Sequence, residues 1–258
     1  MGVRDGSILR SVLLLLTVWQ LAVWLLEPPH YIFPGPIMIA GAISRHGNFL
    51  FHNSLITISE ILIGLTAGSV LGVVTALVIA AVPRVGSLIW PIILILQALP
   101  VFILAPILVL WFGFGMTSKI VMTALIIFFP VTSSFIDGIK RTDACLLDAA
   151  SLTKATHFQT LLHLRAPLAL PSLISGLKIG ATVAPLGAVI GEWVGASAGL
   201  GFVMIQANAR MQTDVTFAAM SIIALMTIIL RQSVDRLTKQ LAPWSREHAP
   251  PPLSSQSK

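Results

Sequence analysis

The chain has few charged residues for its length. Asp, Glu, Lys and Arg make up 10% of its 258 residues, against about one quarter in an ordinary soluble domain. Hydrophobic residues make up 56%, and the mean hydropathy is +0.92. So much apolar surface exceeds what one core can bury. We therefore expect lipid to be the solvent for much of the chain, which argues against a soluble fold.

Cysteine is almost absent. Because Cys145 is the only one, a disulfide or a multi-cysteine metal site within one chain is excluded. The six histidines are scattered and form no His-Glu-x-x-His pattern, so we predict no metal site. Cys145 lacks a convincing partner for a catalytic thiol, and we interpret it as an ordinary small residue. We predict that the chain is not an enzyme.

The hydrophobic residues gather in runs long enough to cross a bilayer as helices, which takes about 20 residues. We predict an all-α, polytopic membrane protein with six transmembrane helices, at residues 8–26, 55–82, 88–112, 120–136, 173–194 and 215–230. Residues 1–242 form the membrane domain. The tail, residues 243–258, is rich in Pro and Ser, and we predict that it is disordered and cytoplasmic.

The net charge is +6, and most of the basic residues lie between and after the predicted transmembrane helices. With the N-terminus inside, thirteen Lys and Arg residues lie on the inner side, and Arg45, Lys119 and Arg210 lie outside. The positive-inside rule then predicts that both termini and the loop 137–172 are cytoplasmic. It also accounts for the basic residues without nucleic acid, which we do not expect as a partner.

Small residues and prolines recur within the spans. Gly64, Gly68 and Gly72 follow a four-residue spacing, as do Gly176 and Gly180 in the fifth span. Such faces let helices approach closely, and we favour packing within one subunit over a seam between two. The third span carries Pro91, Pro100 and Pro106, which predict a kinked helix.

The loop 137–172 contains a polar segment that is predicted to be helical over residues 142–162. Asp143 is suited to cap its start. Since few of its residues are cationic, it is a poor lipid binder, and we interpret it as a docking element for a protein partner rather than a surface helix. Its polar and small residues are Asp148, Ala149, Ala150, Ser151, Lys154 and Ala155, with Phe158 beyond them.

This segment resembles the E-A-A loop of the inner-membrane permease subunits of ATP-binding-cassette (ABC) importers. The resemblance rests on Asp148-Ala149-Ala150, Ala155 and the ending Leu164-Arg165-Ala166-Pro167. Lys154 departs from the pattern, because the family usually has glycine there at a helix-turn-helix bend. Asp148 stands where the family usually has Glu.

Other stretches extend the resemblance to permeases for nitrate, taurine and aliphatic sulfonates. They are Leu99-Pro100, Ala105-Pro106, Trp111-Phe112-Gly113, Phe129-Pro130, Asp137-Gly138-Ile139, Gly191-Glu192 and Gly199-Leu200-Gly201. Within this group, residues 97–102 and 128–132 look most like permeases for the thiamine precursor hydroxymethylpyrimidine. The resemblance implies the type I importer permease fold and a bacterial inner-membrane location.

No G-x-x-x-x-G-K-[ST] motif occurs in the chain, so it cannot bind ATP through a P-loop. We expect no cofactor in this chain. ATP would be bound by a separate ATPase subunit on the cytoplasmic side, where the loop 137–172 lies. The resemblance also implies a periplasmic substrate-binding protein and a second permease copy, because six spans form half a pathway. Nucleotide binding would move the docking helices and switch the access of the pathway.

Four residues are candidates for the pathway: Glu60, Gln97, Pro100 and Glu192. Charges within a membrane are costly and often functional. For Glu60, a structural role is favoured over contact with the pathway, and for Glu192 the two roles are equally favoured. With Lys119 assigned outside, no cation lies deep within a span. This disfavours an anionic substrate and is compatible with a neutral or weakly basic heterocycle.

Two other classes of protein remain as alternatives. A secondary transporter needs inverted repeats and a coupling-ion site, and the halves of this sequence show no repeat. An intramembrane enzyme needs a nucleophile and base, or a metal, at membrane depth. Neither alternative explains the docking segment.

Overall fold

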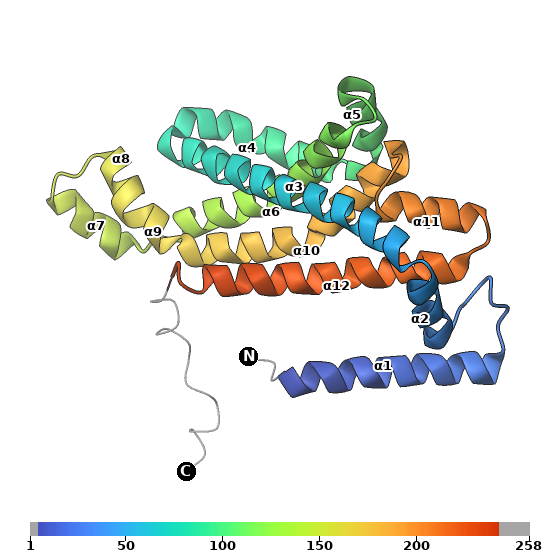
Figure 1. The fold of residues 1–258 in the computed structure, drawn as a ribbon. Coiled ribbons are helices and arrows are strands. Elements are labelled where there is room, and N and C mark those ends of the chain that lie inside the picture. Colours follow the sequence, from blue (N-terminus) through green and yellow to red (C-terminus); the bar gives the residue numbers. More distant parts are fainter. Residues whose placement is uncertain (1–4, 243–258) are drawn as a thin grey trace, which may run out of the picture.

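The structure is a computed structural model that describes residues 5–242, with side chains of the first helix described mainly from Leu13 onward. Every regular element in this part of the chain is helical, so the predicted all-α class is confirmed (Figure 1). The elements are α1 (Asp5–Leu26), α2 (Pro36–Arg45), α3 (Gly47–Ala81), α4 (Pro83–Ala98), η1 (Val101–Ile103), α5 (Leu104–Phe112), α6 (Met116–Lys140), α7 (Ala144–Leu152), α8 (His157–Thr160), η2 (Leu161–Arg165), α9 (Ala166–Leu168), α10 (Leu170–Gly195), α11 (Leu200–Ala209) and α12 (Thr213–Thr238). The predicted tail, residues 243–258, lies outside the described residues.

Four helices are each long and apolar enough to cross a bilayer alone, namely α3, α6, α10 and α12. They correspond to the second, fourth, fifth and sixth predicted spans. The bent pair α4–α5 adds a fifth crossing if it is one broken span. Helix α1 has 22 residues, and its described Leu13–Leu26 part is apolar. The fold is therefore compatible with six spans.

The third predicted span is not one kinked helix, and that prediction was wrong in this respect. Helix α4 ends at Ala98, and the chain resumes as η1 and α5 after a bend of 84°. Pro100 lacks an N–H group and forces the residue before it out of helical geometry, and Leu99 is accordingly extended with ψ 134°. Pro91 and Pro106 both remain inside helices.

Helix α6 lies at the centre of the bundle, between α3 and α10. The glycine faces of its two neighbours pack on it. A Cβ atom added at Gly68 would lie 2.5 Å from the Ala124 carbonyl oxygen, and one at Gly187 would lie 2.7 Å from the Thr123 Cα. These glycines allow the backbones to approach closely. The prediction of tight packing within one subunit is confirmed.

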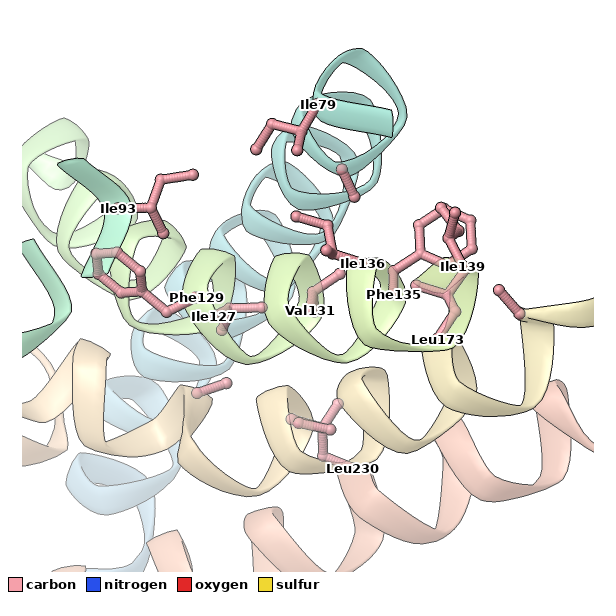
Figure 2. Packing of buried hydrophobic residues seen from close by; sticks show 14 of the residues in the cluster. Ile79, Ile93, Ile127, Phe129, Val131, Phe135, Ile136, Ile139, Leu173 and Leu230 are labelled. Atoms are coloured by element: carbon pink, nitrogen blue, oxygen red, sulfur yellow. The ribbon is translucent and has the colours of Figure 1, made fainter. Parts of the chain in front are cut away.

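The main hydrophobic core follows α6 (Figure 2). Ile127, Val131 and Ile136 of α6 are buried against Ile79 from α3 and Leu173 from α10. Lipid is as apolar as these side chains, so close van der Waals packing, not exclusion of water, holds these helices together. The core therefore fixes α3, α6 and α10 as a rigid unit to which the remaining helices attach.

The bundle has two distinct ends, which position the candidate sites. At the end that we call the α7 end, α7 to α9 project beyond the spans (Figure 1). Helices α2 and α11 lie toward the opposite end, which we call the α11 end (Figure 1). Because α6 begins at the α11 end and α10 returns to it, the Met116 terminus of α6 and the Gly195 terminus of α10 meet there.

Candidate functional site: the docking segment and a buried polar cluster

The predicted docking segment forms a helix, a turn and a second helix. Asp143 caps α7 as expected, because its side chain accepts a hydrogen bond from the Cys145 N–H at 3.0 Å. No residue of α7 is fully buried, and Leu152 at its end is 86% exposed. A capped helix with an exposed apolar tip is suited to contact another protein.

The turn after α7 explains why glycine is usual at the position of Lys154. Lys154 adopts a left-handed conformation with φ 57°, which costs an L-residue other than glycine roughly 1–2 kcal/mol. Thr156 then begins α8 through a capping box with Gln159. The expected bend therefore forms despite the departure from the family pattern, with some strain retained at Lys154.

A shallow groove of about 560 Å³ lies between α7 and the helix that follows the turn. Three of the predicted docking residues, Ala149, Ala150 and Ala155, line it together with larger neighbours such as Leu146 and Gln159. The other four, Asp148, Ser151, Lys154 and Phe158, are absent from the lining, and Phe158 is 60% exposed. The structure thus brings the small residues together and leaves the polar residues and Phe158 outside the groove.

Two polar contacts and one buried side chain fasten this segment to the bundle. The His157 Nε2 lies 3.0 Å from the Ala80 carbonyl oxygen at the end of α3. Arg165 donates a hydrogen bond to the Ile139 carbonyl oxygen of α6 at 3.3 Å. Leu161 between them is 1% exposed. These contacts join α8 and η2, which follow the turn, to α3 and α6.

The second candidate site is a polar cluster buried at the α11 end. Glu60 of α3 and Glu192 of α10 are 2% and 1% exposed, and their carboxyl groups interact. The Thr57 hydroxyl donates to Glu192 Oε1 at 2.6 Å, and the Gly201 N–H donates to the other carboxyl oxygen. Glu60 Oε2 has no hydrogen-bond partner.

Side chains of the cluster accept hydrogen bonds from the N–H groups at the N-terminus of α11. Besides the Gly201 N–H, the Gly199 N–H donates to Asn53 Oδ1 and the Leu200 N–H to Thr57 Oγ1, both at 2.8 Å. These donors have no partner within the helix, and a carboxylate there is favoured by the helix dipole. Side chains of α3 and α10 thus fix the place where α11 begins.

Lys119 completes the cluster from α6. Its ammonium group donates to three backbone carbonyl oxygens, those of Phe114, Gly115 and Gly195. It is 3% exposed and close enough to Glu60 and Glu192 for electrostatic interaction. Because an ammonium group has three N–H donors, all of its donors are used, and Lys119 joins the end of α10 to the start of α6.

The predicted pathway residues fall into two groups. Glu60 and Glu192 belong to the buried cluster, whereas Gln97 and Pro100 are exposed at the break between α4 and η1. A pathway role for each of the four stays a prediction. Asn53, Thr57 and Lys119 were not predicted as site residues from the sequence, which placed Lys119 only on the outer side of the membrane. The one sequence signal for the buried cluster was the presence of small polar residues in an otherwise apolar helix.

The chain matches a known family over most of its length. Residues 68–247 match the family described as binding-protein-dependent transport system inner membrane component. The chain belongs to this family. It is thus a permease subunit of an ABC importer and a multi-pass inner-membrane protein, not an enzyme. ABC importer permeases work with ATPase and binding-protein subunits.

Curated permeases align with nearly the whole chain. A probable ABC transporter permease from Haemophilus influenzae is 45% identical over 245 residues, covering 95% of this chain and all of the relative. The formylaminopyrimidine transport permease ThiX from Halalkalibacterium halodurans is 34% identical, covering 91% of this chain and 94% of the relative.

A solved structure shares the fold. It is a chain of the methionine ABC transporter MetNI, crystallised in inward-facing conformations, with a TM-score of 0.67 and 17% sequence identity. The match covers 76% of this permease and 98% of that chain. The permease therefore has the type I ABC importer fold that the resemblance implied.

Proposed function

We propose that this permease docks on its ATPase through the segment 148–158 and works as a homodimer that imports a nitrogen heterocycle. The observation that carries the docking proposal is the groove between α7 and α8, in which Ala149, Ala150 and Ala155 line a surface with room for a partner's side chains. The contacts of His157 and Arg165 with the bundle support the role of this segment as a lever.

The distribution of charge supports an orientation with the α7 end and both termini in the cytoplasm. Thirteen cations belong to that side in the predicted topology. Of the three assigned to the other side, Lys119 is buried against carbonyl oxygens and Arg45 forms an ion pair with Asp214 at 2.9 Å. Free positive charge is thus scarce at the α11 end, which favours this orientation.

The mechanism that we propose is alternating access. Two ATPase subunits close on ATP and move the docking segments, and the spans of two permease copies reorient around a shared pathway. Moving a conformational equilibrium from 1:99 to 99:1 takes about 5.5 kcal/mol of preferential binding. A segment fastened to both α3 and α6 is suited to transmit such a difference.

For the substrate, we propose a neutral or weakly basic heterocycle such as hydroxymethylpyrimidine. The similarity to a formylaminopyrimidine permease supports this class. Lys119, the one buried cation among the described residues, has all three donors engaged by carbonyl oxygens. It is therefore unsuited to hold nitrate or the sulfonate group of taurine or an aliphatic sulfonate, which are the alternative substrates.

The experiment is to purify the permease with its ATPase and binding protein and to measure stoichiometry and uptake in liposomes. We expect two permease copies beside two ATPases, and uptake of labelled hydroxymethylpyrimidine that excess formylaminopyrimidine suppresses. Taurine, nitrate and an alkanesulfonate at the same excess should leave uptake unchanged. Active complex with a single permease copy would contradict the homodimer, and competition by taurine alone would contradict the heterocycle.

A further inference from the structure

A cavity of about 350 Å³ lies at the α7 end, where the docking segment meets the bundle. Its volume is at the lower end of the range for small-molecule sites, about 300–1,000 Å³. Ile79 of α3, Trp90 of α4 and Ile136 of α6 form part of an apolar wall. Lys140, His157 and Arg165 supply nitrogen donors to the same cavity. It is separate from the groove that we assign to the ATPase.

The donors of this cavity lack acidic partners. The ion pairs among the described residues engage Arg45, Lys178 and Lys239 instead. Lys140 lies 4.9 Å from the centre of the Trp90 ring. The Nε of Arg165 is buried without a hydrogen-bond partner, and leaving such a donor unpaired is unfavourable. The positive charges of Lys140 and Arg165 favour an anionic acceptor in this cavity.

The cavity also lies at a depth that suits a lipid headgroup. It is bordered by the end of α3 at Ala81, the start of α4 at Pro83 and the end of α6 at Lys140. Helix α6 has 25 residues and is membrane-crossing by length and composition, so its Lys140 end lies near the level of the polar headgroups. Basic pockets between membrane helices at this level bind anionic headgroups.

We propose that this cavity binds the phosphate of an anionic phospholipid, with the adjoining glycerol and first methylene groups against the apolar wall. Arg165 and Lys140 contact the phosphate. The apolar wall favours a lipid over a free anion, because Ile79, Trp90 and Ile136 pack well against methylene groups but poorly against a hydrated ion. Since His157 belongs to the docking segment, Arg165 to η2 directly after it and Trp90 to α4, the bound lipid joins that segment to the bundle.

The test uses the full-length permease, purified in a neutral detergent and stripped of lipid, so its outcome does not depend on transport. Phosphatidylglycerol and phosphatidylcholine are added at equal concentration, and retained lipid is counted by native mass spectrometry. We expect one phosphatidylglycerol to be retained in preference to phosphatidylcholine. Lys140→Gln should weaken this retention about fivefold, as expected for about 1 kcal/mol per cation near the membrane surface.

Two variants control for charge and folding. Arg141→Gln removes the neighbouring exposed cation, which does not line the cavity, and should retain phosphatidylglycerol like the wild type. Lys140→Arg keeps the charge and should do the same. Equal retention of the two lipids, or equal losses for Lys140→Gln and Arg141→Gln, would overturn the proposal. So would displacement of the lipid by millimolar inorganic phosphate, which would assign the cavity to a free anion.

Discussion

The hydroxyl group of Thr57 donates a hydrogen bond to Glu192 across 135 positions of sequence, at 2.6 Å, and accepts one from the Leu200 N–H at 2.8 Å. One side chain of α3 thus connects the end of α10 to the beginning of α11. All three groups are buried, where a lost partner is costly. This makes Thr57 a sensitive position for testing the cluster.

We expect Thr57→Val to destabilise the permease by about 1–3 kcal/mol, because it leaves a Glu192 oxygen and the Leu200 N–H without partners. The measurement is thermal unfolding of the purified protein in detergent. Thr66→Val is the matched control on the same helix, since the Thr66 hydroxyl is exposed and bonds only to the Leu62 carbonyl oxygen of its own helix. If both variants unfold alike, the cluster contributes no specific stability.

Gly199 should tolerate no side chain. It adopts φ 108°, and an added Cβ would overlap the carboxyl group of Glu192. We expect Gly199→Ala to lower the yield of folded protein sharply, because backbone strain and overpacking each cost about 1–3 kcal/mol. Gly115→Ala is the control, since its Cβ would meet no atom within 4 Å. The readout is monodisperse protein in size-exclusion chromatography, and a normal Gly199→Ala peak would show that the position has room for a methyl group.

Local patterns predicted much of the fold. Hydrophobic length predicted four helices that the structure shows as crossings by length and composition, and the four-residue spacing of Gly64, Gly68 and Gly72 predicted their packing inside the subunit. The cap at Asp143 was also correct. These features depend on residues close in sequence, whose geometry is set by the helix itself.

The polar cluster could not be predicted from local patterns, because its contacts join residues that are distant in sequence. Lys119 stands just before an apolar run, which predicts only that it lies on the outer side of the membrane, yet it is buried on a carbonyl oxygen of Gly195, 76 positions away. Similarly, Pro100 predicted a kink, but the 84° bend goes with the packing of α4 on α3 and of α5 on α6 and α10. Both outcomes involve contacts between helices that local patterns do not report.

The turn at Lys154 gives a graded prediction. Lys154→Gly should stabilise the docking segment by roughly 1 kcal/mol, because glycine adopts the left-handed conformation without steric cost. Lys154→Val should destabilise it, because a β-branched residue at positive φ is more strained than lysine. Hydrogen exchange of the α7 and α8 amides measures the local effect. Protection that falls in the order Gly, Lys, Val is expected, and equal protection would mean that the turn is not strained.

The docking proposal is tested by Ala150→Arg. Ala150 lines the groove between α7 and α8, where a long side chain would occupy the space of the partner and leave a buried charge unpaired, at a cost of several kcal/mol. We expect normal abundance in the membrane, because the substitution lies outside the spans, with loss of both ATPase association and uptake. Gln240→Arg adds the same charge to an exposed position past α12 at the same end and should leave association and uptake unchanged. Membrane abundance, co-purification of the ATPase and uptake are measured in one strain for each variant. Full uptake by Ala150→Arg would show that the groove is not the docking surface, and equal losses in both variants would assign the effect to charge instead.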